Sequence, residues 1–444
     1  MKKSIIQETL AILVLGFPLT YVISSAHLNT QTSIAPYSHL IFNQSDDLMK
    51  PIVYYENQLR TNPNGPLLLA TLASLYAKEA KLSGDMTLFD KAETLAKKSR
   101  SILQVFNEGP RVVLADIAQA KHDFRKAVEL CKEILADPHT RGGGRQASLS
   151  LLVTSYLALG DLNEAGRYAD QLIDLRPSVG AHALRALVMS AQGRIVDASL
   201  DFQTAFSLEE FGNPVESAWL RAMWGRLEMK QGHFDTAQSL FKEALKISPS
   251  DPLSLNLLAD LEVRQGKYTE AEAHYVEAFS NSKQIVHLIG QIKVKKLKGD
   301  LSGSQELRDQ VEKLLRKQLA RSESGYAHRT ELVRVLLDRG APSDIQEAVS
   351  LLREEIKLRQ SSETYYYLSL SLFHDRKYLE AREAIREALR PGVQDAEYFH
   401  LAGMIEENLG NLSQAGFYSE RAQALDPSLK SKRQPKLAVL ESNG

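Results

Sequence analysis

An alanine returns every thirty-odd residues along most of this chain. Neighbouring members of two series lie 33 to 39 residues apart: Ala165, Ala198, Ala237 and Ala271, followed by Ala348, Ala381 and Ala415. A glycine stands five residues before most of them, at Gly160, Gly193, Gly232, Gly266 and Gly410. A period near ~34 residues predicts a solenoid of two-helix units that bury their apolar faces only against one another.

The segment around Ala237 shows how each unit is specified. Residues 219–230 are predicted to form a first helix, Gly232 the turn, and residues 237–245 a second helix whose apolar residues share one face. Glycine suits the turn because it accepts positive φ, and Pro249 ends the second helix because proline cannot continue its hydrogen bonds. The small side chain of Ala237 lets the two helix backbones approach closely.

The predicted fold is therefore an all-α, right-handed superhelical solenoid of about ten helix-turn-helix units over residues 65–428. The units are placed at 66–105, 108–138, 146–178, 179–212, 218–251, 252–284, 285–317, 327–361, 362–395 and 396–428. The unit at 285–317 is degenerate, because Ser304 takes the place of the alanine. Residues 27–64 are expected to form a polar lead segment and residues 429–444 a basic tail, and either end caps the solenoid or frays.

Three glycine-rich or polar stretches are expected to bend or break the array. They are Gly142-Gly143-Gly144, Gly212-Asn213-Pro214, and residues 322–325. The first is interpreted as a flexible connection between helices, because it lacks the lysine and hydroxyl of a phosphate-binding loop.

The first 26 residues differ from the rest of the chain. Lys2 and Lys3 precede an apolar stretch from Leu10 to Ile23, and small residues follow at positions 24–26. This pattern favours a cleaved signal peptide and export to the periplasm or the outside. A retained inner-membrane anchor is the alternative, although the stretch is shorter than the ~20 residues of a spanning helix. A buried cytosolic helix is the third interpretation.

The alanines at 237, 271, 381 and 415, the glycines at 232, 266 and 410, and the prolines at 249 and 427 resemble the tetratricopeptide-repeat superfamily. Residues 54–56, 62–64 and 399–405 are similar to exported bacterial members without a settled activity. The resemblance implies binding of an extended or helical partner segment in a concave groove lined by first helices. The implied groove residues are Trp219, Arg226, Lys230, Asn256, Asp260, Arg264, Lys293, Lys296, Tyr366 and His400. The carboxylate clamp of chaperone adaptors is not expected, because Ala222 and Asn256 occupy its lysine positions.

Catalytic and metal-binding patterns are lacking in the sequence. The 11 histidines are scattered, and no nucleophile elbow or metalloprotease motif occurs. Cys131 is the single cysteine and takes a packing position four residues after Ala127, so we interpret it as a buried apolar side chain, with an intermolecular disulfide as the alternative. We expect no enzyme activity, cofactor or metal.

Charge is balanced overall but not locally. Lys and Arg total 54 against 55 Asp and Glu, which gives no general attraction to nucleic acid or to an acidic membrane. Residues 283–321 hold ten basic and four acidic residues, interpreted either as a solvated helix surface or as a surface for an acidic partner. Trp219 is either a groove anchor or a packing residue. The resulting hypothesis is a protein-interaction scaffold that does not bind nucleic acid and that binds an acidic extended segment through Arg226, Lys230, Arg264, Lys293 and Lys296. A membrane-tethered envelope assembly or secretion factor is the alternative.

Overall fold

The computed structural model of the chain describes residues 48–105, 107–210, 212–321 and 328–430. Over these ranges it consists of 21 α-helices and one short 3-10 helix, with no strand. The predicted all-α class is confirmed. The predicted signal peptide or anchor, residues 27–47, residues 322–325 and most of the basic tail lie outside the described residues.

The helices, in chain order, are α1 (Met49–Thr61), α2 (Pro66–Ser83), α3 (Met86–Ile102), α4 (Glu108–Ala120), α5 (Phe124–Ala136), α6 (Gly142–Leu159), α7 (Leu162–Leu175), α8 (Val179–Ala191), α9 (Ile195–Ser207), α10 (Pro214–Lys230), α11 (Phe234–Ile247), α12 (Pro252–Arg264), α13 (Tyr268–Ser282), α14 (Ile285–Leu297), α15 (Leu301–Arg321), α16 (Arg329–Arg339), α17 (Pro342–Ile356), α18 (Ser362–His374), α19 (Tyr378–Leu389), α20 (Ala396–Asn408), α21 (Leu412–Leu425) and η1 (Pro427–Lys430).

From α2 to α21 the helices pack as consecutive antiparallel pairs, α2 with α3 and so on to α20 with α21. We number these pairs as units one to ten. Their number confirms the prediction of about ten units for the described chain. Helix α1 precedes them and buries Ile52 in the same hydrophobic cluster as Leu72 and Ala73 of α2. The end of the expected lead segment therefore caps the first unit.

The repeating alanines lie inside the helix pairs, as their spacing predicts. Ala165, Ala198 and Ala237 are fully buried, whereas Ala415, in the last unit, keeps 8% of its surface exposed. The degenerate unit seven buries Ser304, whose hydroxyl donates to the Ile292 carbonyl at 3.0 Å. A buried hydroxyl is unfavourable without a hydrogen-bond partner, so this hydrogen bond allows serine to take the place of alanine.

Local sequence sets where the helices begin. Asp161, Asp251 and Ser361 accept a hydrogen bond from a backbone N–H in the first turn of α7, α12 and α18. These N-caps satisfy donors that the helix itself leaves unpaired. Pro214 and Pro252 occupy the first positions of α10 and α12, where proline has the required φ and its missing N–H costs nothing.

The three glycines at 142–144 are the clearest departure from the sequence-based prediction. They form the first turn of α6 rather than a flexible connection. A Cβ on Gly144 would lie 2.7 Å from the Glu108 side chain, so this glycine permits a close approach to α4, while Gly142 and Gly143 face open space. The prediction was wrong because glycine was taken only as a helix breaker.

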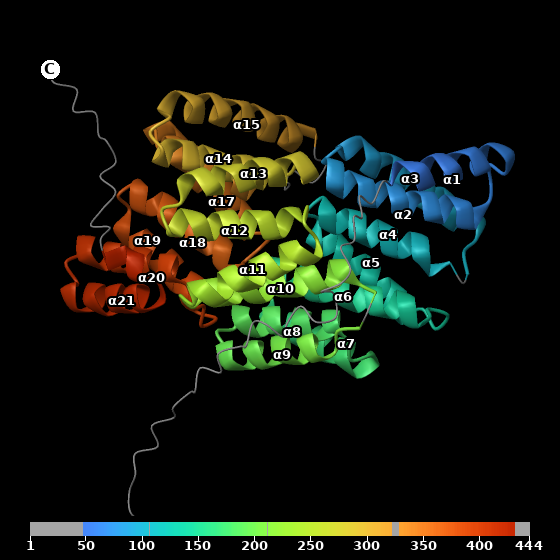
Figure 1. The fold of residues 1–444 in the computed structure, drawn as a ribbon, viewed down its shortest axis with the longest axis horizontal. Coiled ribbons are helices and arrows are strands. Elements are labelled where there is room, and N and C mark those ends of the chain that lie inside the picture. The colour runs from blue at the N-terminus through green and yellow to red at the C-terminus, as the bar shows by residue number, and fades with distance from the viewer. Residues whose placement is uncertain (1–47, 106, 211, 322–327, 431–444) are drawn as a thin grey trace, which may run out of the picture.

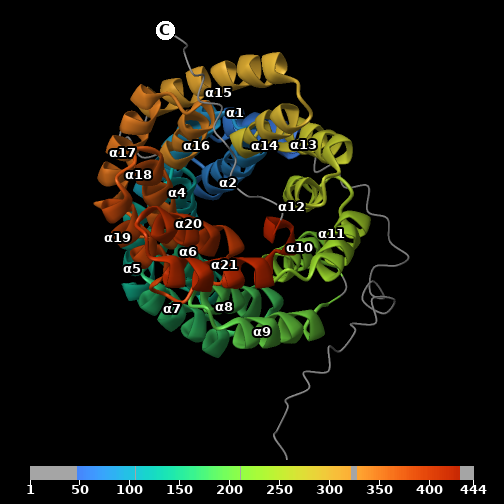
Figure 2. The same ribbon diagram turned by 90° about the vertical axis from the view of Figure 1, so that its left-hand side faces the viewer.

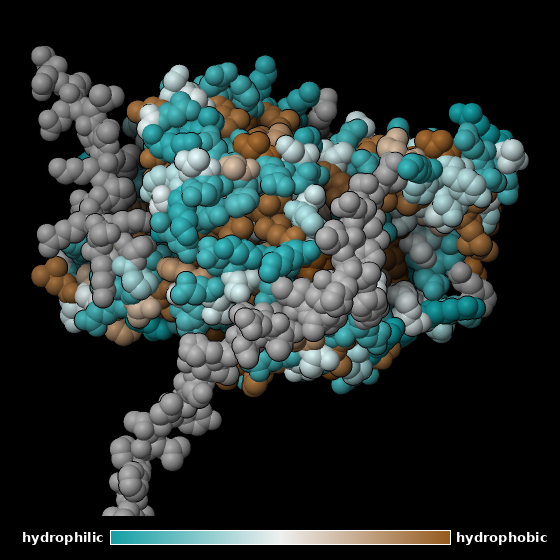
Figure 3. Space-filling view, viewed as in Figure 1, coloured by the Kyte–Doolittle hydropathy of each residue, from teal (hydrophilic) through white to brown (hydrophobic). Residues whose placement is uncertain are grey.

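The ten units wind into a right-handed superhelix that turns back over itself. Figure 2 views it end-on as a ring, with first helices such as α10, α12, α18 and α20 on the inside and second helices such as α9, α11, α15 and α19 on the outside. On the face shown in Figure 3, hydrophilic side chains cover the helices and apolar ones gather in the furrows between them. We call the surface formed by the first helices the inner wall.

Units one to five contact units six to ten along a continuous line, which we call the seam. In each of units one to five, the turn between the two helices meets the end of the second helix of one of units six to ten, or the residues that follow it. In unit three, the Gln360 N–H donates to the Leu159 carbonyl at 2.9 Å, and the backbone of Gln360 and Ser361 leaves no room for a Cβ on Gly160. The seam therefore joins backbone to backbone across 200 residues of sequence.

The same contact recurs along the seam. Unit one places Gly84 beside Lys283, and unit two places His122 beside His328, with ring centroids 5.2 Å apart. The turns of units four and five continue the series: the backbone of Gly392 lies against Gly193, and that of Leu425 lies against Gly232. The regular advance indicates that a full turn of the superhelix takes between five and six units.

Candidate partner-binding surface

The residues implied to line a groove all lie on first helices and so belong to the inner wall. Trp219, Arg226 and Lys230 are on α10; Asn256, Asp260 and Arg264 on α12; Lys293 and Lys296 on α14; Tyr366 on α18; and His400 on α20. Lys293 and Lys296 are exposed and the others half-buried. The structure thus places them on the inner layer of helices, and closure of the superhelix gives several of them partners within the chain.

Two inner-wall cations bind carboxylates of unit ten. The Lys230 ammonium lies 3.0 Å from Asp395, and the Arg264 guanidinium lies 3.0 Å from Asp426 and 3.6 Å from Glu397. These pairs span the space between the fifth and sixth units and the tenth. Sequence reasoning could not find them, because the partners are more than 130 residues apart.

Polar contacts also involve α12 and α14. The Tyr275 hydroxyl donates to Asp260 at 2.5 Å, and Asn256 donates to the same carboxylate at 3.1 Å. Burial raises the pKa of Asp260, against the lowering effect of the Tyr275 hydrogen bond and nearby cations. Lys296 lies 3.0 Å from Asp338 of α16. The contacts of Asp260 therefore lie within unit six, whereas the pair of Lys296 and Asp338 joins units seven and eight.

Three other cations on the inner wall lack such partners. Arg226, Lys293 and Arg334 of α16 make no hydrogen bond or ion pair with any described residue. Burial lowers the pKa of Arg226, although the Glu363 carboxylate nearby acts to raise it. A partly desolvated guanidinium without a hydrogen-bonded anion is costly, and a partner carboxylate would offset that cost.

A tyrosine cluster adjoins these cations. Tyr366 and Tyr398 stack face to face with ring centroids 4.4 Å apart, and Tyr367 meets Tyr366 edge-on at 5.3 Å. Burial raises the pKa of Tyr366 and of Tyr398 well above the usual value, so both stay neutral hydroxyls. Tyrosine and arginine are enriched among interface residues that dominate binding energy.

Sequence reasoning missed Arg334, Tyr367 and Tyr398. In unit eight the turn glycine, Gly340, stands eight residues before Ala348 rather than five, so alignment on the alanine misplaces the wall position. Alignment on the glycine would have identified Arg334. The run of three tyrosines at 365–367 was a visible signal for the aromatic cluster.

The two tryptophans have structural roles. Trp219 is half-buried and packs against two hydrophobic clusters, that of units two to four and that of units four to six. Trp224 is 2% exposed and stacks on Phe202, with centroids 6.3 Å apart. The packing interpretation of Trp219 accounts for these contacts.

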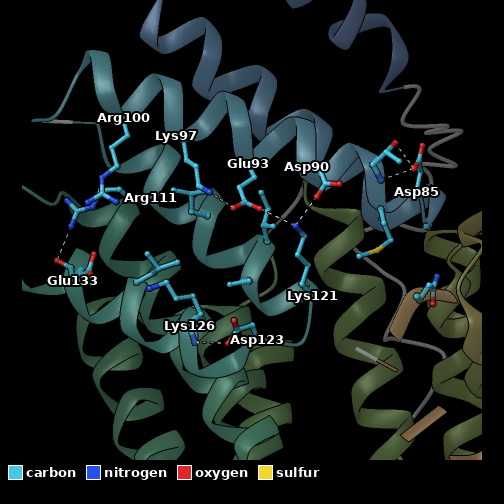
Figure 4. A pocket seen from close by; sticks show the side chains of 18 of the residues that line it. Asp85, Asp90, Glu93, Lys97, Arg100, Arg111, Lys121, Asp123, Lys126 and Glu133 are labelled. Atoms are coloured by element: carbon cyan, nitrogen blue, oxygen red, sulfur yellow. Dashed lines mark hydrogen bonds and ion pairs between the residues drawn. The ribbon is translucent and has the colours of Figure 1, made fainter. Parts of the chain in front are cut away.

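A cleft of about 1650 Å³ is lined by α3, α4 and α5, with residues of α15 beside them. Figure 4 shows its charged lining, in which Glu93 lies between Lys97 and Lys121, at 2.6 Å and 3.1 Å. Burial acts to raise the pKa of Glu93, but the two ammonium groups lower it. Arg111 similarly pairs with Asp137 at 2.5 Å. Because most of its charges are neutralised internally, this cleft has less need of a charged partner than the inner wall.

Half of the cations in the basic cluster at residues 283–321 are neutralised within the chain. Five of its ten cations lie within 3.0 Å of a carboxylate, namely Lys295, Lys296, Lys298, Arg308 and Arg316. Several of these carboxylates belong to neighbouring units, so the cluster mainly bridges units on the surface.

Cys131 is fully buried, and burial raises the pKa of its thiol to about 12. Its interpretation as a packing residue is confirmed. Over the described ranges, no group of three or more His, Cys, Asp or Glu side chains is placed to hold a metal ion. None of the described helices combines the length and apolar character needed to cross a bilayer.

Family models of the tetratricopeptide repeat match two parts of the sequence. One covers residues 222–282, in units five and six, and the other covers residues 396–429, which are unit ten. A search of curated proteins returned no significant match.

Solved structures with a similar fold share little sequence identity with the chain. A human IFIT1 dimer with PPP-AAAA is 16% identical with a TM-score of 0.46, covering 89% of this chain and 93% of its own. Yeast Tom70 is 18% identical with a TM-score of 0.42, covering 87% and 89%. PilW, a type IV pilus biogenesis factor, is 18% identical with a TM-score of 0.37, covering 46% and 92%. That this chain does not bind nucleic acid stays a prediction.

Proposed function

Since the chain is a tetratricopeptide-repeat solenoid, we propose that it is a non-enzymatic scaffold that holds an extended or helical segment of a partner protein against its inner wall. The observation that carries this proposal is the set of three wall cations, Arg226, Lys293 and Arg334, that lack a hydrogen-bonded anion among the described residues. A segment bearing carboxylates would provide that anion.

Two physical features support binding at this surface. Buried alanines pack the two helices of each unit closely together, so the scaffold loses little conformational entropy when a partner is ordered on it. Tyr366, Tyr367 and Tyr398 add large, semi-rigid apolar area with a polar tip next to the cations. An acidic segment with an aromatic or aliphatic side chain matches both features.

The test is charge reversal at the wall with a matched control on the outside. The probe is a fluorescein-labelled deca-glutamate peptide, measured by fluorescence anisotropy on the full chain at low salt. We expect Arg226→Glu with Arg334→Glu to weaken binding at least tenfold. The control double variant Lys313→Glu with Arg386→Glu changes net charge equally, but its exposed cations lie on the outer helices α15 and α19. Equal losses in both variants would show that only net charge matters and would contradict the proposed surface.

We propose that the scaffold acts outside the cytoplasm, because Lys2, Lys3 and the apolar stretch from Leu10 to Ile23 follow the order of a secretory signal. Mass spectrometry of the protein from its native host tests this. A mature chain that starts near His27 supports export, and an intact N-terminus in the membrane fraction supports a tethered envelope assembly or secretion factor. An intact N-terminus in the cytosolic fraction contradicts both.

A further inference from the structure

Unit ten occupies part of the surface to which the sequence assigned an acidic partner. Lys230 and Arg264 were expected to bind partner carboxylates, and in the structure they bind Asp395, Glu397 and Asp426. Asp395 is 8% exposed and Asp426 is 4% exposed, so both carboxylates are largely shielded from water. The chain itself thus supplies the chemistry that the wall is expected to recognise.

The contact of unit ten with units five and six is polar, whereas its apolar packing lies elsewhere. Leu401, Ala402 and Ile405 belong to the hydrophobic cluster that runs through units seven to nine. The cluster of units four to six contains no residue of unit ten. Charge pairs and the backbone contact at Gly232 therefore hold unit ten in this position, without a shared apolar core.

Another carboxylate could take the place of Asp395 and Asp426 in these ion pairs. The Lys230 side chain is 39% exposed and that of Arg264 is 20% exposed, so water and ions reach the cationic halves of both pairs. An ion pair whose cation reaches water is weakened by salt. A carboxylate-bearing segment supplied in trans would make the same contacts and would compete with unit ten once its concentration offsets the high effective concentration of a carboxylate in the same chain.

We propose that unit ten is an internal competitor, which occupies Lys230 and Arg264 in cis until an acidic partner segment takes the same cations in trans. This inference rests on the proposed function and deepens it, because it names regulation of the same wall. Binding would then release unit ten from units five and six while its apolar contacts with unit nine persist.

The experiment neutralises the internal competitor without changing its shape. In the full chain, Asp395→Asn is combined with Asp426→Asn; asparagine at 395 keeps the N-cap of α20, because its side-chain oxygen still accepts a backbone N–H. The control is Asp197→Asn with Asp375→Asn, which removes two carboxylates that pair with nearby cations on their own units. Circular dichroism checks that all variants stay folded.

Two measurements read out the competition. Affinity for the fluorescein-labelled deca-glutamate peptide is expected to rise at least fivefold in the Asp395 and Asp426 double variant and to stay unchanged in the control. Amide hydrogen exchange in α20 and α21 is expected to speed up at least tenfold in the double variant, with α18 and α19 unaffected. Adding Lys230→Gln and Arg264→Gln should cancel the gain in affinity while leaving the faster exchange.

The outcomes separate this inference from the proposed function. Unchanged affinity in the double variant, with or without faster exchange, overturns the competition. If the probe still depends on Arg226 and Arg334 in that case, the proposed function stands and only the internal competitor is wrong. If the probe binds neither the wild type nor the double variant, both fall. If the double variant fails to fold, Lys230→Gln with Arg264→Gln breaks the same pairs from the other side, and α20 and α21 must then exchange faster.

Discussion

The turn glycines of the early units and of the later units have the same sequence position and nearly the same backbone, but different surroundings. Gly193 in unit four has φ of +74° and Gly266 in unit six has φ of +75°. A Cβ on Gly193 would collide with the backbone of Gly392 across the seam, whereas a Cβ on Gly266 would meet nothing within 4 Å. Glycine therefore serves two purposes. In the early and the later units alike it allows the left-handed turn between two helices, and in the early units it also allows the backbone across the seam to approach closely.

The difference teaches how the superhelix closes. Local sequence defines each unit, whose turn holds a residue in the left-handed conformation. Closure also requires that the turns of units three to five stay free of side-chain atoms, since Gly160, Gly193 and Gly232 all face backbone. Gly410 of unit ten has nothing within 4 Å of its Cβ position and carries no such requirement. The turn glycines of units three to five are therefore expected to tolerate substitution less well than those of the later units.

The largest expected effect comes from Gly193→Ala compared with Gly266→Ala. Each change places a Cβ on a left-handed residue, which costs about 1–2 kcal/mol. Gly193→Ala also forces the seam apart, which adds about 1–3 kcal/mol by the usual cost of overpacking. We expect urea denaturation to give a free energy of unfolding for Gly193→Ala that is lower by that additional amount. Equal losses for the two variants would mean that the turns do not meet at Gly193.

Ala237→Leu tests the interior of a unit against the end of the array. Ala237 is fully buried inside unit five, so three extra side-chain heavy atoms are expected to cost about 1–3 kcal/mol. Ala415→Leu, in the unit that no other follows, should cost less, because that alanine is already 8% exposed. Thermal and urea unfolding measure both. A neutral Ala237→Leu would show that the register of unit five is wrong.

The seam at His122 is expected to weaken in acid. His122 has φ of +62° and faces His328, Glu331 and Arg359 across the seam. Burial lowers the pKa of His122 to about 4, although the Glu331 carboxylate acts to raise it. Because the folded-state pKa lies below the usual value near 6.5, the contribution of neutral His122 is complete above pH 6.5 and is lost as the pH falls toward 4.

We expect His122 to account for about 1–2 kcal/mol of lost stability between pH 7 and pH 5. The measurement compares urea unfolding of the wild type with that of His122→Asn, since asparagine tolerates the left-handed conformation. The variant should lose less stability over this interval. Arg376, which has φ of +59° at the same position of unit nine, provides the control, and Arg376→Asn should leave the pH dependence as it is. Identical pH profiles for His122→Asn and the wild type would contradict a seam at this residue.

The smallest expected effect has the opposite sign. Gly142 lies in the first turn of α6, has no positive φ, and its Cβ position is open. Gly142→Ala is therefore expected to stabilise the fold by about 0.4–1 kcal/mol, chiefly because alanine lowers the entropy of the unfolded chain. Gly144→Ala should not stabilise, because its Cβ would press on Glu108. A loss of stability in Gly142→Ala would indicate that this segment needs the flexibility first inferred from its sequence.

The sequence predicted what depends on neighbours within one unit. The alanine spacing placed Ala165, Ala198 and Ala237 in buried positions, and the glycines five residues earlier, such as Gly232, adopt the left-handed turn. Even Cys131 was predicted correctly, because its position in the unit sets its burial. These features follow from helix periodicity and from the restricted backbone of a tight turn.

The sequence did not predict what depends on the sum over many units. The pitch of the superhelix adds up small rotations between neighbours, and only that sum decides whether Gly193 meets Gly392. For the same reason Lys230 was assigned to a partner although it pairs with Asp395, 165 positions later. The unpaired cations of the wall were only partly found, because unit eight shifts its turn and hides Arg334.

Zero-length carbodiimide cross-linking tests the closed two-turn superhelix most directly, since it joins only amines and carboxylates in direct contact. The cross-turn pair Lys230 and Asp395 is 3.0 Å apart, and Lys298 and Glu272, in neighbouring units, are 2.6 Å apart at comparable exposure. The closed superhelix predicts that mass spectrometry detects both linked peptides in the monomeric protein. Detection of the link between Lys298 and Glu272 without the link between Lys230 and Asp395 would contradict closure and indicate an open solenoid.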